Sequence, residues 1–492
     1  MTEPPARVAR DAAWSTVGVL FSGGTQFLTS LLVARLGGPA LLGILRGSLS
    51  LANLATLLWP STAGPAASLF LARERAAARE EAARGAARHL ALTSIGVAIL
   101  LAPVAAWLSV VLFGLSWVDA AWVAALTVAL SAYHLARGLR FGAGQVRRAA
   151  TWEIICSGVA IMLLVGVLMA GWAGWILAPL VAGNLLYSAG AWLAVFRGPA
   201  STSAEQLREI HAFVSWGVAG TVASAGLMQL SMILAKTQSD DVVAGFYAAA
   251  ISLATPLSMV ARAVSMAIFP EMARQRGRNE PAATRATTDR ATRGLVALMT
   301  PLFCALILVA DPLVALVYGP GFAGAILPLR VLLVAVWLLV LPVPSVNAIN
   351  VAGPAGIRLS ALLSWAGLLV GLTSMAVWSL TAGIVGIAAG YLAGVATTSI
   401  SSFGYVWHRD RQPWGRIVGW ATALMTITVA AAAWFRDPLT QPGLALAAGV
   451  GILLLAAAAL RLLLPDLSRS LLALSSPRRP ADAPTTAEHQ DD

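Results

Sequence analysis

Three arginines lie inside otherwise apolar stretches of the sequence, where a charged side chain needs a chemical reason. Arg46, Arg262 and Arg330 each interrupt a run of hydrophobic and small residues, and a charge at the centre of a membrane helix costs about 2.5–3.5 kcal/mol on insertion scales. A guanidinium can bind phosphate bidentately, with about 1.5–3 kcal/mol for each charged hydrogen bond. Binding of an anion would offset the cost of burying the charge. Two further cations could add to such a site, Arg35 and Lys236, which lie at the ends of two apolar stretches.

A simpler interpretation of these cations stays open. Each of the three arginines lies only part of the way into its stretch, so its long side chain could reach back to the water interface. Arg35 and Lys236 would then be ordinary charged helix ends. The two interpretations predict different effects of substitution, because an interfacial side chain tolerates any polar replacement.

The acidic residues indicate the sign of a bound molecule. None is expected near the middle of a helix, and those closest to the apolar stretches lie at predicted helix ends or in loops: Asp119, Glu153, Asp240, Asp241 and Asp311. Exporters of cationic molecules normally need a buried carboxylate. Buried cations without buried anions favour an anionic cargo.

The elements that must position these residues are membrane helices. The 492 residues are 58% hydrophobic and 11% charged, whereas soluble domains have about 25% charged residues. The period-2 alternation of a membrane barrel is absent, so we expect an all-α, polytopic membrane protein. Apolar segments long enough to cross a bilayer number fourteen: 13–34, 41–59, 90–113, 118–136, 152–171, 174–196, 212–235, 243–269, 295–317, 324–346, 359–380, 383–405, 416–435 and 443–464.

The net charge of +11 reflects membrane topology and excludes a nucleic-acid partner. If the N-terminus is cytoplasmic and the loops alternate, most of the 33 lysines and arginines fall on the inner side, for example in 73–88 and 274–293. This distribution obeys the positive-inside rule. We therefore expect a multi-pass protein of the plasma (inner) membrane with both termini in the cytoplasm and with some attraction to membrane lipids.

An internal repeat predicts two similar lobes. WSTVGVLFSGGTQFLTSLL at 14–32 resembles WGVAGTVASAGLMQLSMIL at 216–234, and Gly43 then aligns with Gly245. Six helices separate the copies, so both cross the membrane in the same direction, related by an axis along the membrane normal. The first two helices of each lobe would line a cleft between them. The expected parts are lobes 1–200 and 201–406, a helix hairpin 407–465 and a disordered cytoplasmic tail 466–492.

Motifs for covalent chemistry are missing from the sequence. There is no GxxxxGK[ST] phosphate loop, no HExxH motif and no cluster of cysteine and histidine. The expected outer loops are too short to hold a sugar donor. We expect no catalysis, no cofactor and no metal site.

Three stretches resemble the polysaccharide biosynthesis and oligosaccharide flippase family. They are VARLGGPALLGILRGSLSLANL, VVAGFYAAAISLATPLSMVARAVSMAIFPEMAR and LVYGPGFAGAILPLRVL, in the family's order and spread over most of the chain. The resemblance implies the fold of multidrug and toxin extrusion exporters and of lipid II flippases. It also implies cavity-facing arginines on helices 2 and 8, which match Arg46 and Arg262. The related lipid II flippases also have cavity arginines on helix 1, and this sequence has no arginine at the middle of its first helix.

The resemblance implies a flippase that moves lipid-linked oligosaccharide, typically on undecaprenyl diphosphate, from the inner to the outer leaflet for cell-surface polysaccharide. Alternating access without covalent chemistry would perform this task, with possible contacts to other polysaccharide-assembly proteins. Two alternatives stay open. The chain could be a drug or metabolite exporter of the same fold, which a buried carboxylate in the cleft would favour, or a non-transporting scaffold of a polysaccharide assembly complex.

Reporter fusions test the predicted topology. Because the arginine-rich loops should be cytoplasmic, fusions after residues 85, 145 and 285 should report cytoplasm, and fusions near 38, 239 and 321 should report the outside. A clear inversion among the first eight helices would contradict both the charge argument and the orientation of the repeat.

Overall fold

The computed structural model describes residues 5–435 and 439–463, and these residues form helices without a strand. The predicted tail 466–492 lies outside the described residues. In chain order the helices are α1 (Pro5–Leu57), α2 (Pro60–Ala76), α3 (Glu80–Phe113), α4 (Trp117–Gly142), α5 (Val146–Met169), η1 (Ala173–Trp175), α6 (Ala178–Val195), α7 (Ala204–Gln238), α8 (Asp241–Gly277), α9 (Pro281–Leu308), α10 (Ala310–Val317), η2 (Pro320–Ala325), α11 (Ile326–Val340), α12 (Val343–Asn350), α13 (Pro354–Asp410), α14 (Gly415–Trp434) and α16 (Pro442–Leu463).

Two of the helices are hairpins that fold back at a glycine with positive φ. In α1 the glycine is Gly38 (φ 76°), and Arg46 reaches Ser30 at 2.9 Å although a straight helix would hold residues this far apart at about 24 Å. In α13 the glycine is Gly383 (φ 54°), and Thr398 reaches the carbonyl of Leu363 at 3.4 Å. The described residues contain twelve candidate membrane spans. Counting both arms of each hairpin gives the fourteen segments predicted.

Several helices differ from the predicted segments in length, and prolines explain most of the breaks. Pro60 begins α2 directly after α1, so the predicted second helix continues beyond residue 59 at a bend. The predicted helix 324–346 is broken after α11, where Pro342 precedes α12. Proline cannot donate the backbone hydrogen bond that a continuous helix requires. The predicted helix 295–317 is likewise divided, at Val309 between α9 and α10.

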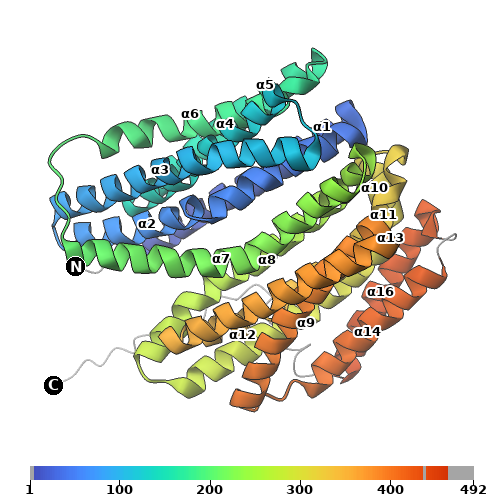
Figure 1. The fold of residues 1–492 in the computed structure, drawn as a ribbon. Helices are drawn as coiled ribbons and strands as arrows, with labels where there is room; N and C mark the ends of the chain where they lie inside the picture. Colours follow the sequence, from blue (N-terminus) through green and yellow to red (C-terminus); the bar gives the residue numbers. More distant parts are fainter. Residues whose placement is uncertain (1–4, 436–438, 464–492) are drawn as a thin grey trace, which may run out of the picture.

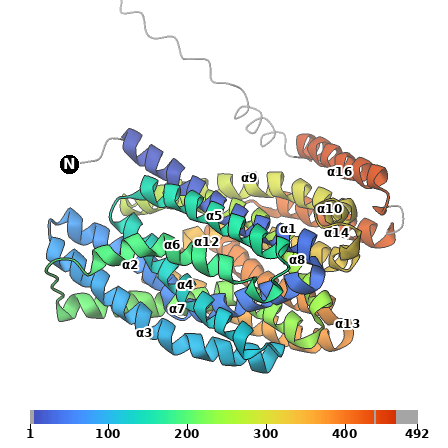
Figure 2. The same cartoon turned by 90° about the horizontal axis from the view of Figure 1, so that it is seen from above.

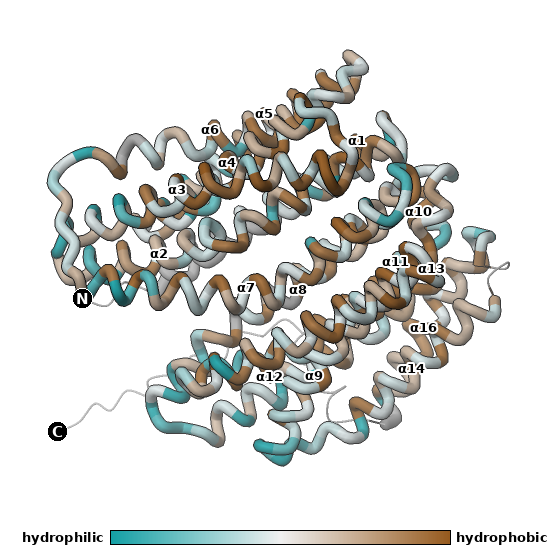
Figure 3. Tube along the Cα trace, viewed as in Figure 1, coloured by the Kyte–Doolittle hydropathy of each residue, from teal (hydrophilic) through white to brown (hydrophobic). Residues whose placement is uncertain are grey.

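The helices form two groups with α7 and α8 between them. Figure 1 shows α1–α6 (blue to teal) on one side and α9–α16 (yellow to red) on the other, with the green α7 and α8 crossing the middle. Both α14 and α16 pack against α9, and Figure 2 shows α16 at the edge of the bundle. Figure 3 shows hydrophobic stretches along the helices and hydrophilic ones near helix ends. The turns at 77–79, 143–145 and 278–280 mark one end, which we call the arginine-rich end.

The contact between α1 and α8 follows the predicted repeat. A Cβ on Gly43 would overlap the carbonyl oxygen of Asp241, and a Cβ on Gly245 would overlap the carbonyl oxygen of Pro39. The repeat aligns Gly43 with Gly245 and Pro39 with Asp241, so the two contacts are reciprocal. Reciprocal contacts are what a twofold axis between two equivalent surfaces produces. This part of the bundle therefore has the twofold arrangement that a repeat predicts.

A methyl group at Gly245 tests this close approach. The nearest atoms are backbone atoms of α1 and cannot rotate away, so Gly245→Ala should lower the free energy of unfolding by about 1–3 kcal/mol, the usual cost of overpacking. Thermal unfolding of the purified protein in detergent measures this. Gly220→Ala is the matched control, because a Cβ there meets nothing within 4 Å. Equal unfolding temperatures of the two variants would contradict the packing described.

Candidate functional site

A polar cavity of about 380 Å³ lies among α1, α4, α5 and α6. The two arms of the α1 hairpin form one wall, and Gln229 of α7 reaches the cavity from the neighbouring helix. Most of the polar lining consists of hydroxyl and amide side chains: Ser22, Thr25, Gln26, Thr29, Ser30, Asn53, Thr56, Ser61, Ser157, Asn184 and Gln229. Such side chains can donate and accept hydrogen bonds without adding charge.

Arg46 lines this cavity on the second arm of α1. Its Nε donates to the hydroxyl of Ser30 at 2.9 Å, and one Nη donates to the carbonyl of Gln26 at 3.4 Å. Both acceptors are neutral, and no acidic side chain among the described residues forms an ion pair with Arg46. The guanidinium is half-buried and keeps donor capacity toward the cavity.

The same cavity contains a buried carboxylate that the sequence does not predict. Glu153 was placed at a helix start, but α5 begins at Val146, so the residue lies two turns inside the helix and is 7% exposed. The hydroxyl of Tyr133 donates to its two carboxylate oxygens at 2.8 and 3.0 Å. Arg137 lines the same cavity and provides a compensating charge. The prediction that Glu153 starts its helix is therefore wrong, although the residue still lies outside the middle of α5.

Two of the predicted cations lie near the α1–α8 contact and have protein partners. The guanidinium of Arg35 donates to the carbonyls of Val317, at 2.6 Å, and Leu316. Lys236 is buried and forms an ion pair with Asp241, so its charge is already compensated. Neither residue lines the cavity that holds Arg46.

Arg330 lies apart from Arg46, in the second group of helices. It forms an ion pair with Asp311 at 2.6 Å and donates to the carbonyl of Ala432 at 3.2 Å. The small cavity beside it, about 200 Å³, is otherwise lined by apolar residues. Arg262 belongs to α8, but its side chain lies outside the described residues. Of the five predicted cations, Arg46 is thus the one that the described structure places in a polar cavity.

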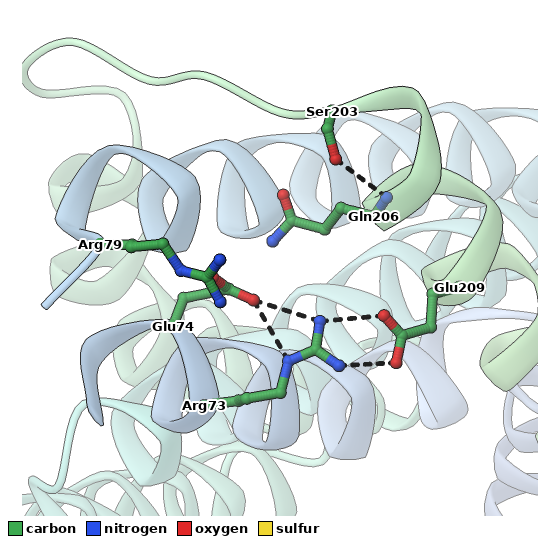
Figure 4. Close-up of polar contacts among 6 residues, drawn as sticks. All are labelled: Arg73, Glu74, Arg79, Ser203, Gln206 and Glu209. Atoms are coloured by element: carbon green, nitrogen blue, oxygen red, sulfur yellow. Dashed lines mark hydrogen bonds and ion pairs between the residues drawn. The ribbon is translucent and has the colours of Figure 1, made fainter. Parts of the chain in front are cut away.

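Ion pairs join α2 to α7 at the arginine-rich end (Figure 4). Arg73 of α2 forms a bidentate pair with Glu209 of α7, at 2.6 and 2.9 Å, and also contacts Glu74 at 3.1 Å. Arg79 contacts the other carboxylate oxygen of Glu74, and the Glu74 residue is 3% exposed. The hydrogen bonds with Glu209, aided by Glu74, raise the pKa of Arg73 above its ordinary value. The sequence explains these arginines by topology alone and does not indicate the acids that pair with them.

Comparison with known families decides the family of the chain. Residues 25–327 match the family described as "Polysaccharide biosynthesis protein", and this match covers more than half of the sequence. The chain belongs to the polysaccharide biosynthesis protein family. A search of curated proteins finds no match.

Solved structures share the fold of this family member. The lipid II flippase MurJ in an inward closed conformation matches with a TM-score of 0.70 and 12% identity, over 93% of this chain and 99% of that chain. An inward-facing multidrug resistance MATE transporter of the MOP superfamily matches with a TM-score of 0.58 and 19% identity, over 81% of this chain and 94% of that chain. A MOP superfamily transporter from Pyrococcus furiosus, described as having a binding pocket of reverse polarity, matches with a TM-score of 0.55 and 17% identity. The match covers 82% of this chain and 95% of that chain. The fold of this member is therefore that of membrane transporters.

Proposed function

We propose that this protein is a flippase that moves lipid-linked oligosaccharide, carried on a polyprenyl diphosphate, from the cytoplasmic to the outer leaflet. The observation that carries the proposal is the position of Arg46 in a cavity otherwise rich in hydroxyl and amide groups. The guanidinium would bind the diphosphate and the neutral polar side chains would bind sugar hydroxyls. The volume of about 380 Å³ lies in the usual range of ligand pockets, about 300–1,000 Å³.

The hydrogen bonds of Arg46 in the protein support this assignment. They are made to a hydroxyl and to a carbonyl, which are neutral acceptors. Phosphate oxygens form shorter and stronger charge-assisted hydrogen bonds, so a diphosphate could displace these weak partners at little cost. The paired cations Lys236 and Arg330 would have to give up a carboxylate first.

The energetics of the membrane explain why such a cargo requires a protein. A headgroup of several sugars and two phosphates would lose its hydrogen bonds with water on crossing hydrocarbon, at a cost of about 2–7 kcal/mol for each unsatisfied polar group. The cavity would replace those bonds while the polyprenyl chain stays in the bilayer. In this proposal residues 1–200 and 201–406 are the two lobes of an alternating-access transporter in the plasma membrane, with both termini cytoplasmic.

Substitutions of Arg46 test the proposal. Arg46→Ala should lower flipping by roughly tenfold to a hundredfold, because about 1.5–3 kcal/mol is lost with each charged hydrogen bond. Arg46→Lys should recover part of the activity, since a point charge cannot form the bidentate contact. The measurement is the accumulation of lipid-linked oligosaccharide in the inner leaflet.

The controls separate cargo binding from loss of charge alone. Arg358→Ala removes an exposed arginine outside the cavity and should leave flipping unchanged. Near-wild-type flipping by Arg46→Gln would indicate an interfacial role for Arg46 and would contradict the proposed contact with diphosphate.

Glu153 favours a second candidate function, the export of a drug or metabolite. A buried carboxylate is the feature expected of carriers of cationic molecules, and Glu153 lies in the same cavity as Arg46. Its hydrogen bonds with Tyr133 and the proximity of Arg137 also suit a purely structural role. The cavity therefore has chemistry for both signs of charge, and the role of Glu153 distinguishes the two functions.

Glu153→Gln separates these functions because the amide keeps the shape and a contact with Tyr133 but removes the charge. In the flippase, this variant should retain flipping within about threefold, since Gln preserves the hydrogen-bonded neighbourhood. In an exporter of cations, cells that express the wild-type chain should tolerate cationic compounds and cells with Glu153→Gln should not. Tolerance that depends on Glu153, with no effect of Arg46→Ala on lipid-linked oligosaccharide, would replace the flippase by the exporter.

A further inference from the structure

A second cavity, of about 330 Å³, lies at the arginine-rich end of the α1–α6 group. Its walls come from α2 and α3 on one side and from α5 and α6 on the other, with α4 between them. Alanine, leucine, valine and glycine make up most of the lining, together with Trp152. Its basic side chains are Arg75, Arg84, Arg140 and Arg148, and no acidic residue lines it.

Arg140 is the unusual member of this group. The residue is 7% exposed, and its buried Nη1 has no hydrogen-bond partner. Its guanidinium lies 4.2 Å from the centre of the Tyr187 ring and 6.0 Å from that of Trp152, so aromatic faces hold it in place. Its other terminal nitrogen lies close to Gly190, another residue of the cavity lining. A buried guanidinium with an unused donor costs free energy unless an acceptor is supplied.

The ion pairs of Figure 4 provide a direct contrast at the same end of the molecule. There Arg73 and Arg79 are compensated by Glu74 and Glu209. In the second cavity, Arg75 contacts Glu80 at 3.5 Å. Neither Arg140 nor Arg148 forms an ion pair among the described residues. Arg140 has Glu153 in its electrostatic surroundings, but no carboxylate of the described residues comes within ion-pair distance of it, and its Nη1 has no partner.

We propose that this cavity binds the phosphate of an anionic phospholipid from the surrounding leaflet. Arg140 and Arg148 would donate to the phosphate oxygens, and the apolar walls would contact the glycerol backbone and the first carbons of the acyl chains. Basic pockets between membrane helices are suited to such headgroups, and tryptophan is favoured at the level of the headgroups. The apolar walls favour a lipid over a soluble phosphate. The proposal does not depend on which cargo the transporter moves.

Native mass spectrometry of the full chain in detergent tests the proposal, with phosphatidylglycerol and phosphatidylcholine of identical acyl chains as probes. The wild type should retain phosphatidylglycerol in preference to phosphatidylcholine. Arg140→Gln combined with Arg148→Gln should weaken that binding about tenfold or more, as expected for the loss of charged hydrogen bonds. Gly190→Leu should weaken it similarly, because the side chain would fill the cavity beside Arg140 without removing a charge.

The controls make each outcome decisive. Arg290→Gln removes an exposed arginine of α9, whose Nε contacts only a carbonyl of its own helix, and should leave lipid binding unchanged. Equal retention of the two lipids, or unchanged binding in both cavity variants, would overturn the proposal. Displacement of the lipid by inorganic phosphate would also overturn it and indicate a site for soluble anions. If the double variant fails to fold, Gly190→Leu and Arg148→Gln alone decide the question.

Discussion

Two segments separated by 202 residues pack backbone against backbone, and the arrangement of the helices around them depends on this contact. Gly43 and Gly245 let α1 and α8 approach until a carbonyl of one helix occupies the place where a side chain of the other would begin. Because the contacts are reciprocal, they hold the two copies of the repeat around one axis. Arg46 follows Gly43 by less than one turn, so the same contact fixes where its side chain enters the polar cavity.

The basic residues inside the bundle fall into two chemical kinds. Lys236 and Arg330 have carboxylate partners, and removing either partner would leave a buried charge uncompensated. Arg46 and Arg140 form no ion pair among the described residues, and their direct contacts are with neutral or aromatic groups. An anion that arrives at the second kind gains charge-assisted hydrogen bonds and displaces little. Local pairing therefore distinguishes structural cations from candidate binding residues better than depth in the membrane does.

Much of the fold could be predicted because hydrophobic length and arginine distribution are local properties. The helical class and the fourteen segments follow from hydrophobic length, and the internal repeat predicts the equivalence of Gly43 with Gly245. The site was harder, because pairing depends on which helices meet. Glu153 was misplaced when α5 was started too late, and Asp311 was not recognised as the partner of Arg330 on another helix. One sequence contains no direct signal for such contacts.

The repeat also shows how the position of Arg46 differs between the two copies. The shift that aligns Gly43 with Gly245 aligns Arg46 with Ala248, which is fully buried. A second guanidinium at that position would face the same axis, and two buried like charges without anions between them would repel strongly in a medium of low dielectric constant. Duplication thus supplies two matching scaffolds, and at this position only the first of them carries a guanidinium. The small apolar Ala248 lets the second copy pack tightly at this position.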